Sequence, residues 1–395
     1  MVFTLTARWI FPVSGPPLER GTITIDGERI VAVEPHGRRT PDEDCGNAAI
    51  IPGLVNAHTH LDLSGARGQL PPTDADHFPD WLRQVIAYRR TRTPQQVAAD
   101  IRAGLAECLR FGTTLVGDIS ADGTAWPILS AAPVRAVVFR ELLGLTDERA
   151  WHAWATADEW LRHHPPTATC RPGLSPHAPY SARATLFDWV ARTPLVATHL
   201  AESPAEMELL RFHRGPLVAF LQELGVWDAD GLTTWEKLLT EPPSAGRYLF
   251  AHANYLPLAW AERFTHRHSI VYCPRTHAAF RHPPHPFRQW CARGVRVCLG
   301  TDSLASNPDL DLLAEARWVR QSYPDCPGEL VLRMATLAGA QALGWADACG
   351  SLEVGKSADL VVVPLPNADA ADPHELLLRA EGAAERRTLF RGVWR

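Results

Sequence analysis

The sequence predicts an α/β fold in which eight parallel strands close into a (β/α)8 TIM-like barrel, with a small β-sandwich domain formed from both ends of the chain. Three observations predict it. Eight short, β-branched, apolar runs follow one another between residues 50 and 300, each run ends close to a polar residue, and helix-like segments such as 94–110 and 183–191 separate the runs. Strands that alternate with helices form a parallel sheet, and eight of them close into a barrel.

The eight predicted barrel strands occupy residues 50–57, 113–118, 134–139, 170–175, 195–198, 248–251, 269–272 and 295–300. The residues just beyond them are, in order, His58, Asp118, Arg140, His177, His199, His252, Cys273 and Asp302. In barrels of this type the carboxyl ends of the strands form the active-site face. The alignment of ionisable residues with strand ends therefore predicts an active site.

The two flanks have a different pattern, with short alternating strands at 22–25, 30–33, 359–363 and 388–390. We expect residues 1–52 and 350–395 to pair into one small β-domain, and residues 53–349 to form the catalytic barrel. The connection 212–246, between the fifth and sixth strands, is long for a barrel of this kind. Long ordered connections are often lids, and a second helix without a catalytic task is the alternative.

Composition places the chain among ordinary globular proteins, with 395 residues, 46% hydrophobic and 21% charged. The net charge of −5 argues against a nucleic-acid partner, and no apolar run approaches the roughly 18 residues that a membrane span needs. The N-terminus lacks the zones of a signal peptide, and eight scattered cysteines without a CxxC pair are typical of buried thiols. These features predict a cytoplasmic protein. The fourteen tryptophans fit either a core or the interface of a homo-oligomer.

The residues His58-Thr59-His60 close the first predicted strand. Side chains two residues apart in an extended chain point the same way, so both imidazoles can bind one ion. His199 ends the fifth strand and Asp302 follows the eighth. Three imidazoles and one carboxylate suit a single divalent ion, Zn²⁺ first and Fe²⁺ as the alternative.

Five segments carry a resemblance to a known family: 52–60 (PGLVNAHTH), 198–202 (THLAE), 251–252 (AH), 300–303 (GTDS) and 350–360 (GSLEVGKSADL). The chain resembles the amidohydrolase superfamily, in its cytosine/adenosine-deaminase and chlorohydrolase-like branch. Many relatives hold two metals bridged by a carbamylated lysine after the fourth strand. The only lysines here, Lys237 and Lys356, lie in a helix-like stretch and in the terminal β-segment, so we expect a mononuclear site.

The resemblance implies a hydrolytic deaminase that releases ammonia. It implies that Asp302 accepts the proton of a metal-activated water, that Glu202 protonates the ring nitrogen of the substrate, and that His252 orients the nucleophile. The alternatives are a solvated helix-start carboxylate for Glu202 and a core position for His252. A non-catalytic scaffold protein is a further alternative, but it predicts gaps among the ligand positions, and here all of them are filled.

The segment 272–280 (YCPRTHAAF) is similar to that of aminodeoxyfutalosine deaminases, which serve menaquinone biosynthesis. The leading substrate is therefore 6-amino-6-deoxyfutalosine, a purine nucleoside-like small molecule. The alternatives are S-adenosylhomocysteine or another adenosine-like nucleoside, guanine, and a chlorinated or aminated triazine. The substrate-binding candidates are His177, Arg140, His277, Phe280 and Arg67. Arginine side chains match planar anions, and His277 has the alternative of only fixing its loop.

Overall fold

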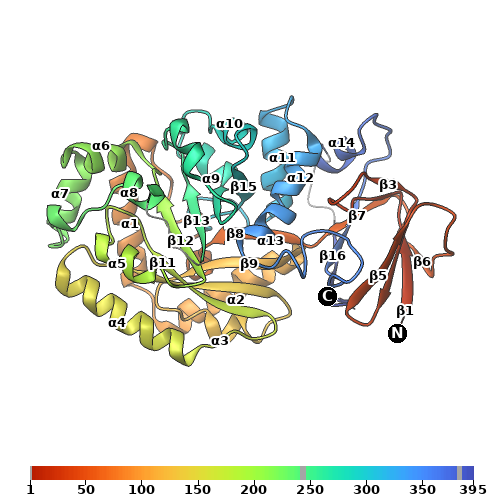
Figure 1. Cartoon of the computed structure of the whole chain (residues 1–395), viewed down its shortest axis with the longest axis horizontal. Coiled ribbons are helices and arrows are strands. Elements are labelled where there is room, and N and C mark those ends of the chain that lie inside the picture. The colour runs from red at the N-terminus through yellow and green to blue at the C-terminus, as the bar shows by residue number, and fades with distance from the viewer. Residues whose placement is uncertain (1, 241–245, 380–384) are drawn as a thin grey trace.

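The computed structural model describes residues 2–240, 246–379 and 385–395, and it contains a barrel with a small β-domain beside it (Figure 1). The barrel sheet has the order β15-β14-β13-β12-β11-β10-β9-β8, and every neighbouring pair is parallel. Its strands are β8 (Leu54–Thr59), β9 (Thr113–Ser120), β10 (Arg135–Leu142), β11 (Cys170–Pro176), β12 (Leu195–Leu200), β13 (Arg247–His252), β14 (His268–Tyr272) and β15 (Arg296–Leu299). The predicted barrel is confirmed.

The ring of strands comes together between β15 and β8, at the end of the barrel that carries the predicted site. The backbone N–H groups of Thr301 and Asp302 both donate to the carbonyl of His58, at 3.1 Å. The side chain of Asn56 donates to the hydroxyl of Thr301 at 2.8 Å. The last strand end is therefore joined directly to the first one, which brings Asp302 next to the two histidines.

The first predicted strand is wrong in one respect, because the run 50–57 belongs to two strands. Residues up to Pro52 form β7 (Ala48–Pro52), which pairs antiparallel with β16 (Leu360–Pro364) of the small domain. Gly53 then leads into β8 of the barrel. A Cβ atom at Gly53 would overlap the side chain of Thr114, 2.0 Å from its hydroxyl oxygen. The unbroken apolar run hides this crossing, since both strands are buried on both faces.

Replacing Gly53 by alanine should therefore destabilise the whole molecule, because the new methyl group has to displace Thr114. We expect a loss of about 1–3 kcal/mol, which is typical of an overpacked core, measured by urea denaturation. Gly15→Ala is the control, because no atom lies within 4 Å of a Cβ built there. Equal stability of the two variants would contradict the crossing at Gly53.

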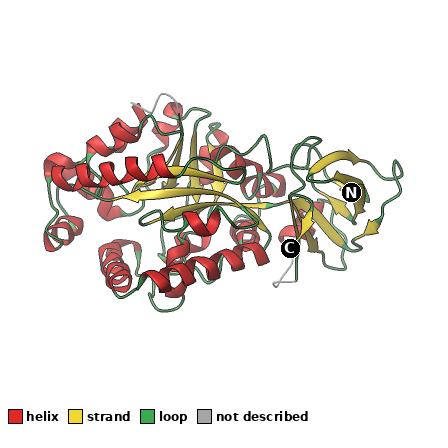
Figure 2. Ribbon diagram, turned by 90° about the horizontal axis from the view of Figure 1, so that it is seen from below, coloured by secondary structure: helices red, strands yellow, loops and turns green. Residues whose placement is uncertain are grey.

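Two sheets form the small domain. One has the order β5-β4-β1-β6 and the other β18-β17-β16-β7-β2-β3, so the second sheet combines both chain ends as predicted (Figure 2). Side chains from both sheets form a common core, including Leu5, Ile25, Ile50 and Leu360. The strands not yet given are β1 (Val2–Thr6), β2 (Trp9–Ile10), β3 (Leu18–Glu19), β4 (Thr22–Asp26), β5 (Arg29–Glu34), β6 (Glu43–Asp44), β17 (Arg387–Phe390) and β18 (Val393–Trp394). The domain limits at 52/53 and 349/350 stay a prediction.

Helices surround the barrel strands, as the red ribbons in Figure 2 show. The predicted helix 94–110 is α2, and its start follows from a capping box between Thr93 and Gln96 with Pro94 in the first turn. The helices are α1 (Phe78–Arg90), α2 (Pro94–Arg110), α3 (Trp126–Leu129), α4 (Asp147–His163), α5 (Ala184–Val190), α6 (Pro204–Phe212), α7 (Pro216–Glu223), α8 (Trp235–Thr240), α9 (Pro274–Ala279), α10 (Phe287–Ala292), α11 (Leu312–Ser322), α12 (Gly328–Met334), α13 (Leu337–Ala342) and α14 (Pro373–Leu378). Short 3-10 turns lie at Leu61–Ala66, Ala75–His77, Ala229–Gly231 and Leu258–Arg263.

The long connection 212–246 contains α7 and α8, while its residues 241–245 lie outside the described part. Phe220 and Leu221 of α7 line a cavity next to the predicted site. The connection therefore supplies a helical wall, and its role as a lid stays a prediction.

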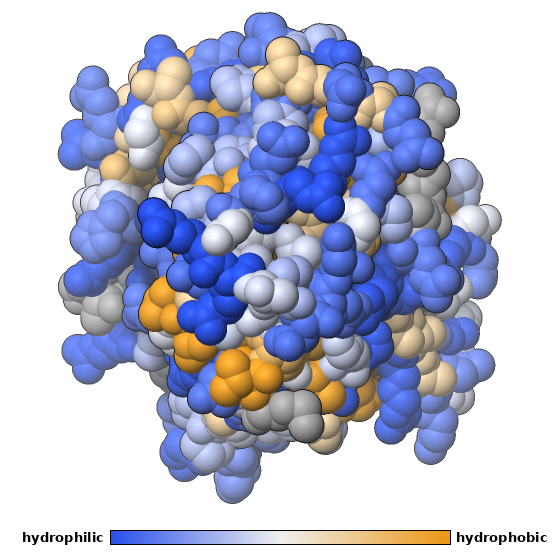
Figure 3. Space-filling model, turned by 90° about the vertical axis from the view of Figure 1, so that its right-hand side faces the viewer, coloured by the Kyte–Doolittle hydropathy of each residue, from blue (hydrophilic) through white to orange (hydrophobic). Residues whose placement is uncertain are grey.

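Exposed hydrophobic side chains are few on the described surface. Trp151 of α4 is the most exposed tryptophan, at 64%, whereas Trp160 of the same helix is buried. Figure 3 shows the end of the molecule formed by the small domain, where hydrophilic residues predominate and hydrophobic ones gather below the centre. No described helix combines the length and the hydropathy of a membrane-spanning segment.

Candidate metal centre and active site

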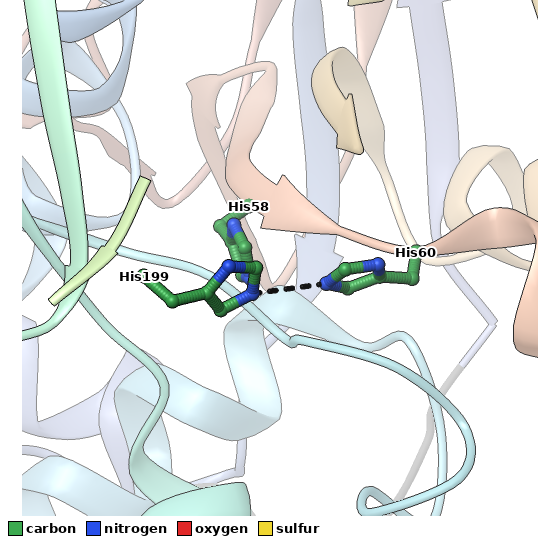
Figure 4. A group of neighbouring side chains, drawn as sticks. All are labelled: His58, His60 and His199. Atoms are coloured by element: carbon green, nitrogen blue, oxygen red, sulfur yellow. Dashed lines mark hydrogen bonds between the residues drawn. The ribbon is translucent and has the colours of Figure 1, made fainter. Parts of the chain in front are cut away.

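Three imidazoles converge at the carboxyl ends of the barrel strands (Figure 4). His58 and His60 extend from the end of β8, and His199 comes from β12. One ring nitrogen of each lies within 4.8 Å of the others, and all three residues are buried. Nε2 of His60 and Nε2 of His199 are 3.3 Å apart. These three residues are brought together as the sequence predicts.

The carboxylate of Asp302 completes the group. Its Oδ1 lies 3.7 Å from Nε2 of His58 and 3.6 Å from Nε2 of His60. Ligand atoms about 2.0–2.1 Å from a tetrahedral ion are about 3.4 Å from one another, so the four side chains have the spacing of a metal centre. Nε2 of His58 is buried without a hydrogen-bond partner, as expected of an atom reserved for a cation. Three nitrogens and one oxygen fit Zn²⁺ or Fe²⁺.

The protonation states also suit metal binding. Burial lowers the pKa of His58 to about 3 and holds the pKa of His60 and His199 well below the usual value, so the rings are neutral at pH 7. Nδ1 of His199 donates to the carbonyl of His177 at 2.9 Å. That hydrogen bond leaves Nε2 as the free lone pair and fixes the ring towards the centre.

At three of the strand ends that form the site, one residue has a left-handed backbone conformation. The φ angles are 50° at Ala201, 70° at His252 and 55° at Asp302. Non-glycine residues adopt this region rarely, and such strain gathers at functional sites. At Asp302 the hydroxyl of Thr59 donates to the carbonyl at 2.8 Å and stabilises the turn.

Glu202 and His252 lie together beside the metal centre. Nε2 of His252 is 3.4 Å from Oε1 of Glu202, and both side chains are buried. Burial, reinforced by the nearby Asp302, raises the pKa of Glu202 well above its usual value, while burial lowers that of His252. The raised pKa favours the protonated form of Glu202, and the lowered pKa makes His252 a neutral imidazole at pH 7, which suits a proton donor and a hydrogen-bonding partner.

Sequence reasoning missed Glu206, which holds the backbone under Glu202. Its carboxylate accepts hydrogen bonds from the N–H groups of Ala201 and Glu202 at 2.9 and 2.8 Å. Glu206 is completely buried. The signal was a second glutamate in the first turn of the helix that follows THLAE, which is an ordinary feature of helix starts.

His177 is held in a charged network that was only partly visible in the sequence. Its Nδ1 lies 2.7 Å from Oε1 of Glu141. The guanidinium of Arg89, on α1, contacts Glu141 at 3.3 Å and Asp62 at 3.1 Å. His177 and Arg89 lower the pKa of Glu141 despite its burial, so the carboxylate is ionised and accepts a hydrogen bond from Nδ1 of His177. Arg89 and Asp62 were not predicted, because only the docking of α1 brings them here.

Two adjacent cavities open from the centre. The inner one, of about 60 Å³, is lined by five of the predicted site residues, together with Trp81 of α1. These five are His60, His177, His199, Glu202 and Asp302. The outer one, of about 350 Å³, has mainly apolar walls from α1, α7 and the loop after β10, with Arg90 and Arg149 at its lining. His177, Arg89, Glu141 and Tyr180 line both. A substrate could place its reacting group in the inner cavity and a substituent in the outer one.

Arg140 and Arg67 lie apart from the two cavities. The guanidinium of Arg140 donates to the carbonyl of Asp122 at 3.1 Å. Neighbouring residues of a strand point to opposite faces, so Arg140 points out of the barrel while Glu141 points inwards. Arg67 pairs with Glu107 of α2, and its side chain is 45% exposed. The structure does not bring either residue to the other predicted ones.

His277 and Phe280, on and just after α9, are buried behind the site. The ring of Phe280 meets Trp81 edge-on, 5.0 Å between centroids, and Trp81 lines the inner cavity. His277 lies among Tyr272, His282 and His285, and its Nε2 has no hydrogen-bond partner. Neither side chain lines the two cavities, and the substrate roles of all five candidates stay predictions.

The two lysines lie away from the centre, as expected. Lys237 contacts Asp188 at 3.4 Å, and Lys356 contacts Glu353 at 2.8 Å. The position after the fourth barrel strand belongs to His177. No lysine of the chain is therefore placed to bridge a second metal.

Comparison with known proteins agrees with this geometry. The sequence pattern of the amidohydrolase family matches residues 49–380. A 5-methylthioadenosine/S-adenosylhomocysteine deaminase of Moorella thermoacetica is 29% identical, over 93% of this chain and 86% of the relative. An aminodeoxyfutalosine deaminase of Deinococcus radiodurans is 29% identical, over 86% and 85%. Among solved structures, an adenosine deaminase from Xanthomonas campestris with bound zinc has a TM-score of 0.80 and 26% identity, with 99% and 92% of the chains covered. The family pattern spans most of the chain, including all four residues of the metal centre, and we conclude that the chain belongs to the amidohydrolase family.

Proposed function

We propose that this protein is a mononuclear metal-dependent deaminase that replaces the exocyclic amino group of a purine nucleoside-like substrate with oxygen. One observation carries the proposal: the buried side chains of Glu202 and His252 lie 3.4 Å apart beside three histidines and an aspartate with metal-ligand spacing. The relatives named deaminases support the same chemistry. Zn²⁺ is the proposed ion, with Fe²⁺ as the alternative.

When bound, the ion would supply an acidified water, whose pKa can fall from 15.7 to about 7 on zinc. His58, His60, His199 and Asp302 would hold it. Burial raises the pKa of Asp302 to about 7, and this carboxylate would take a proton from the attacking water. Glu202 gives its own proton to the ring nitrogen, which makes the neighbouring carbon electrophilic. His252 orients the nucleophile with a hydrogen bond. Asp302 then passes its proton to the amine, which leaves as ammonia, and the hydroxyl group of the tetrahedral intermediate returns a proton to Glu202.

The outer cavity supports 6-amino-6-deoxyfutalosine among the candidates. That compound carries an aryl group with a carboxylate beyond its ribose, and the cavity offers apolar walls with Arg149 and Arg90. S-Adenosylhomocysteine carries both a carboxylate and an ammonium group. Of the described residues that line this cavity, Glu141 is the only one with a carboxylate, and it is already engaged by His177 and Arg89. A substrate that carries a carboxylate but no ammonium group therefore matches the lining better than S-adenosylhomocysteine does.

Ammonia release from a panel of compounds tests the substrate class. We expect the highest kcat/KM for 6-amino-6-deoxyfutalosine, lower values for S-adenosylhomocysteine and adenosine, and negligible values for guanine and an aminated triazine. A preference for guanine or triazine over every adenine nucleoside would refute the nucleoside proposal.

Arg149→Gln tests the outer cavity within the same panel. Loss of one charge-assisted hydrogen bond should raise KM for 6-amino-6-deoxyfutalosine about tenfold, while kcat/KM for adenosine, which has no acid, should stay the same. Arg102→Gln, on the exposed face of α2, removes an equal charge as the control. Equal effects on both substrates would argue against an acid-binding role.

Menaquinone biosynthesis and a cytoplasmic location follow as parts of the proposal. The eight cysteines are free thiols, as is usual in a reducing compartment.

A further inference from the structure

A third cavity, of about 640 Å³, lies at the opposite end of the barrel from the candidate metal centre. It is lined where strands begin: by Arg171 of β11, by Pro194 and Leu195 of β12 and by Gly246 and Arg247 of β13. His266, Arg267, Gly344 and Asp347 complete it. Because all barrel strands are parallel, their starts and their ends lie on opposite faces. This cavity therefore has no part in the chemistry at His58 and Glu202.

Positive charge dominates this cavity. Among the described residues that line it, there are three guanidinium groups and a single carboxylate, that of Asp347. Arg296, at the start of β15, adjoins the cavity and donates to the carbonyl of His266 at 2.7 Å. Burial lowers the pKa of Arg171 and of Arg296, and the charge of Arg247 lowers both further. The arginines therefore repel one another, and an anion between them would relieve that repulsion.

Arg171 is fixed in place before any ligand arrives. It donates to the carbonyl of Gly344 at 2.6 Å, and its guanidinium lies 3.7 Å from the ring centre of Trp345. An exposed arginine has to give up rotamer freedom when it binds an anion. Arg171 has already been ordered by the fold.

Gly344 lets two guanidinium groups approach the same point. Its φ is 75°, in the region that favours glycine. A Cβ atom there would lie 3.2 Å from Nε of Arg247 and 3.3 Å from Nη1 of Arg171. The Arg247 guanidinium is half-buried, and it has neither a hydrogen bond nor an ion pair with any described residue. Two converging guanidinium groups, one of them without a hydrogen bond or ion pair to a described residue, form an arrangement that suits anion binding.

We propose that this cavity is a binding site for a phosphate group, with Arg171 and Arg247 as the two arms that hold it. Planar guanidinium forks match phosphate oxygens in pairs, and Arg is the side chain most often used for this purpose. The phosphate can come from inorganic phosphate or from a phosphate monoester such as a nucleotide, for which a cavity of this volume has room. His266 and Arg267 line the same cavity.

Calorimetric titration of the intact protein with inorganic phosphate and with AMP, at constant ionic strength set by sodium chloride, tests the proposal. We expect saturable binding of both probes to the unmodified protein. An AMP affinity more than tenfold above that of phosphate identifies a nucleotide site, and equal affinities identify a site for free phosphate. No binding at millimolar concentration overturns the proposal.

Variants separate this site from general charge effects. Arg247→Gln should weaken binding about tenfold, through loss of a charged hydrogen-bond pair, and Arg247→Lys should lie in between. Asp347→Asn should tighten binding, since it removes the only carboxylate among the described residues that line the cavity. Arg293→Gln, with its guanidinium on the carbonyl of Gln289, changes the net charge by the same amount and should have no effect. Deaminase activity should stay unchanged in all four, so failure here is distinguishable from failure of the proposed function. Equal binding by Arg247→Gln and Arg293→Gln would overturn the assignment.

Discussion

Replacing Glu202 by glutamine should reduce kcat by about two to four orders of magnitude while the bound metal remains. Burial and the nearby Asp302 raise the pKa of this carboxyl well above its usual value, which favours the protonated form. Glutamine matches the shape of a neutral carboxylic acid but has no transferable proton, and general acid catalysis contributes this range of rate. Steady-state kinetics with metal analysis of the same preparation measures both quantities.

The pH dependence gives an independent check on the same residue. A general acid works only while protonated, so kcat of the unmodified protein should fall as the pH rises through the raised pKa of Glu202. The Glu202→Gln variant should lack that limb of the profile. Near-normal kcat in the variant would remove Glu202 from the mechanism. Glu208→Gln, on an exposed part of α6, is the matched control.

Removing the metal should abolish turnover, and adding Zn²⁺ should restore it. The water that attacks the substrate is a poor nucleophile unless an ion lowers its pKa by several units. His58→Ala should bind metal weakly, because the remaining ligands leave an incomplete set. Metal content and activity should fall together in both experiments.

Stability provides a second measurement of the same centre. A ligand that binds only the folded state stabilises it by about 4 kcal/mol at a thousandfold excess over its Kd, so the Tm should drop when the protein is stripped of metal. His152→Ala, on the exposed face of α4, should change neither metal content nor Tm. Full activity after exhaustive chelation would contradict the whole mechanism.

The sequence was sufficient to predict that His58, His60, His199 and Asp302 come together, because their positions depend on chain topology. In a parallel barrel every strand end reaches the same face, so residues as distant as His58 and Asp302 meet without any knowledge of packing. The small domain was predictable for a similar reason, since short alternating strands at both flanks had no other partners.

The surroundings of the substrate were harder to predict because they depend on helix docking. Arg89 reaches Glu141 only because α1 lies across the barrel mouth. On β10 the sequence could not distinguish Arg140 from Glu141, because apolar residues occupy both faces of that buried strand. Side chains alternate between the two faces of β10, and Val137 and Phe139 point into the barrel core, so Glu141 points inwards as well. The sequence did not reveal which face points inwards, and Arg140 was preferred because arginine is a common anion ligand.

The pairing of β7 with β16 also has a consequence for biosynthesis. The ribosome makes β7 about three hundred residues before its antiparallel neighbour, so one edge of β7 has to wait, open to other chains, during most of translation. The barrel strand β8 continues directly from it. A nascent chain that stalls before residue 360 would therefore expose an unpaired, apolar strand edge that is prone to aggregation. Chaperone binding to the nascent chain should be greatest before this residue is synthesised.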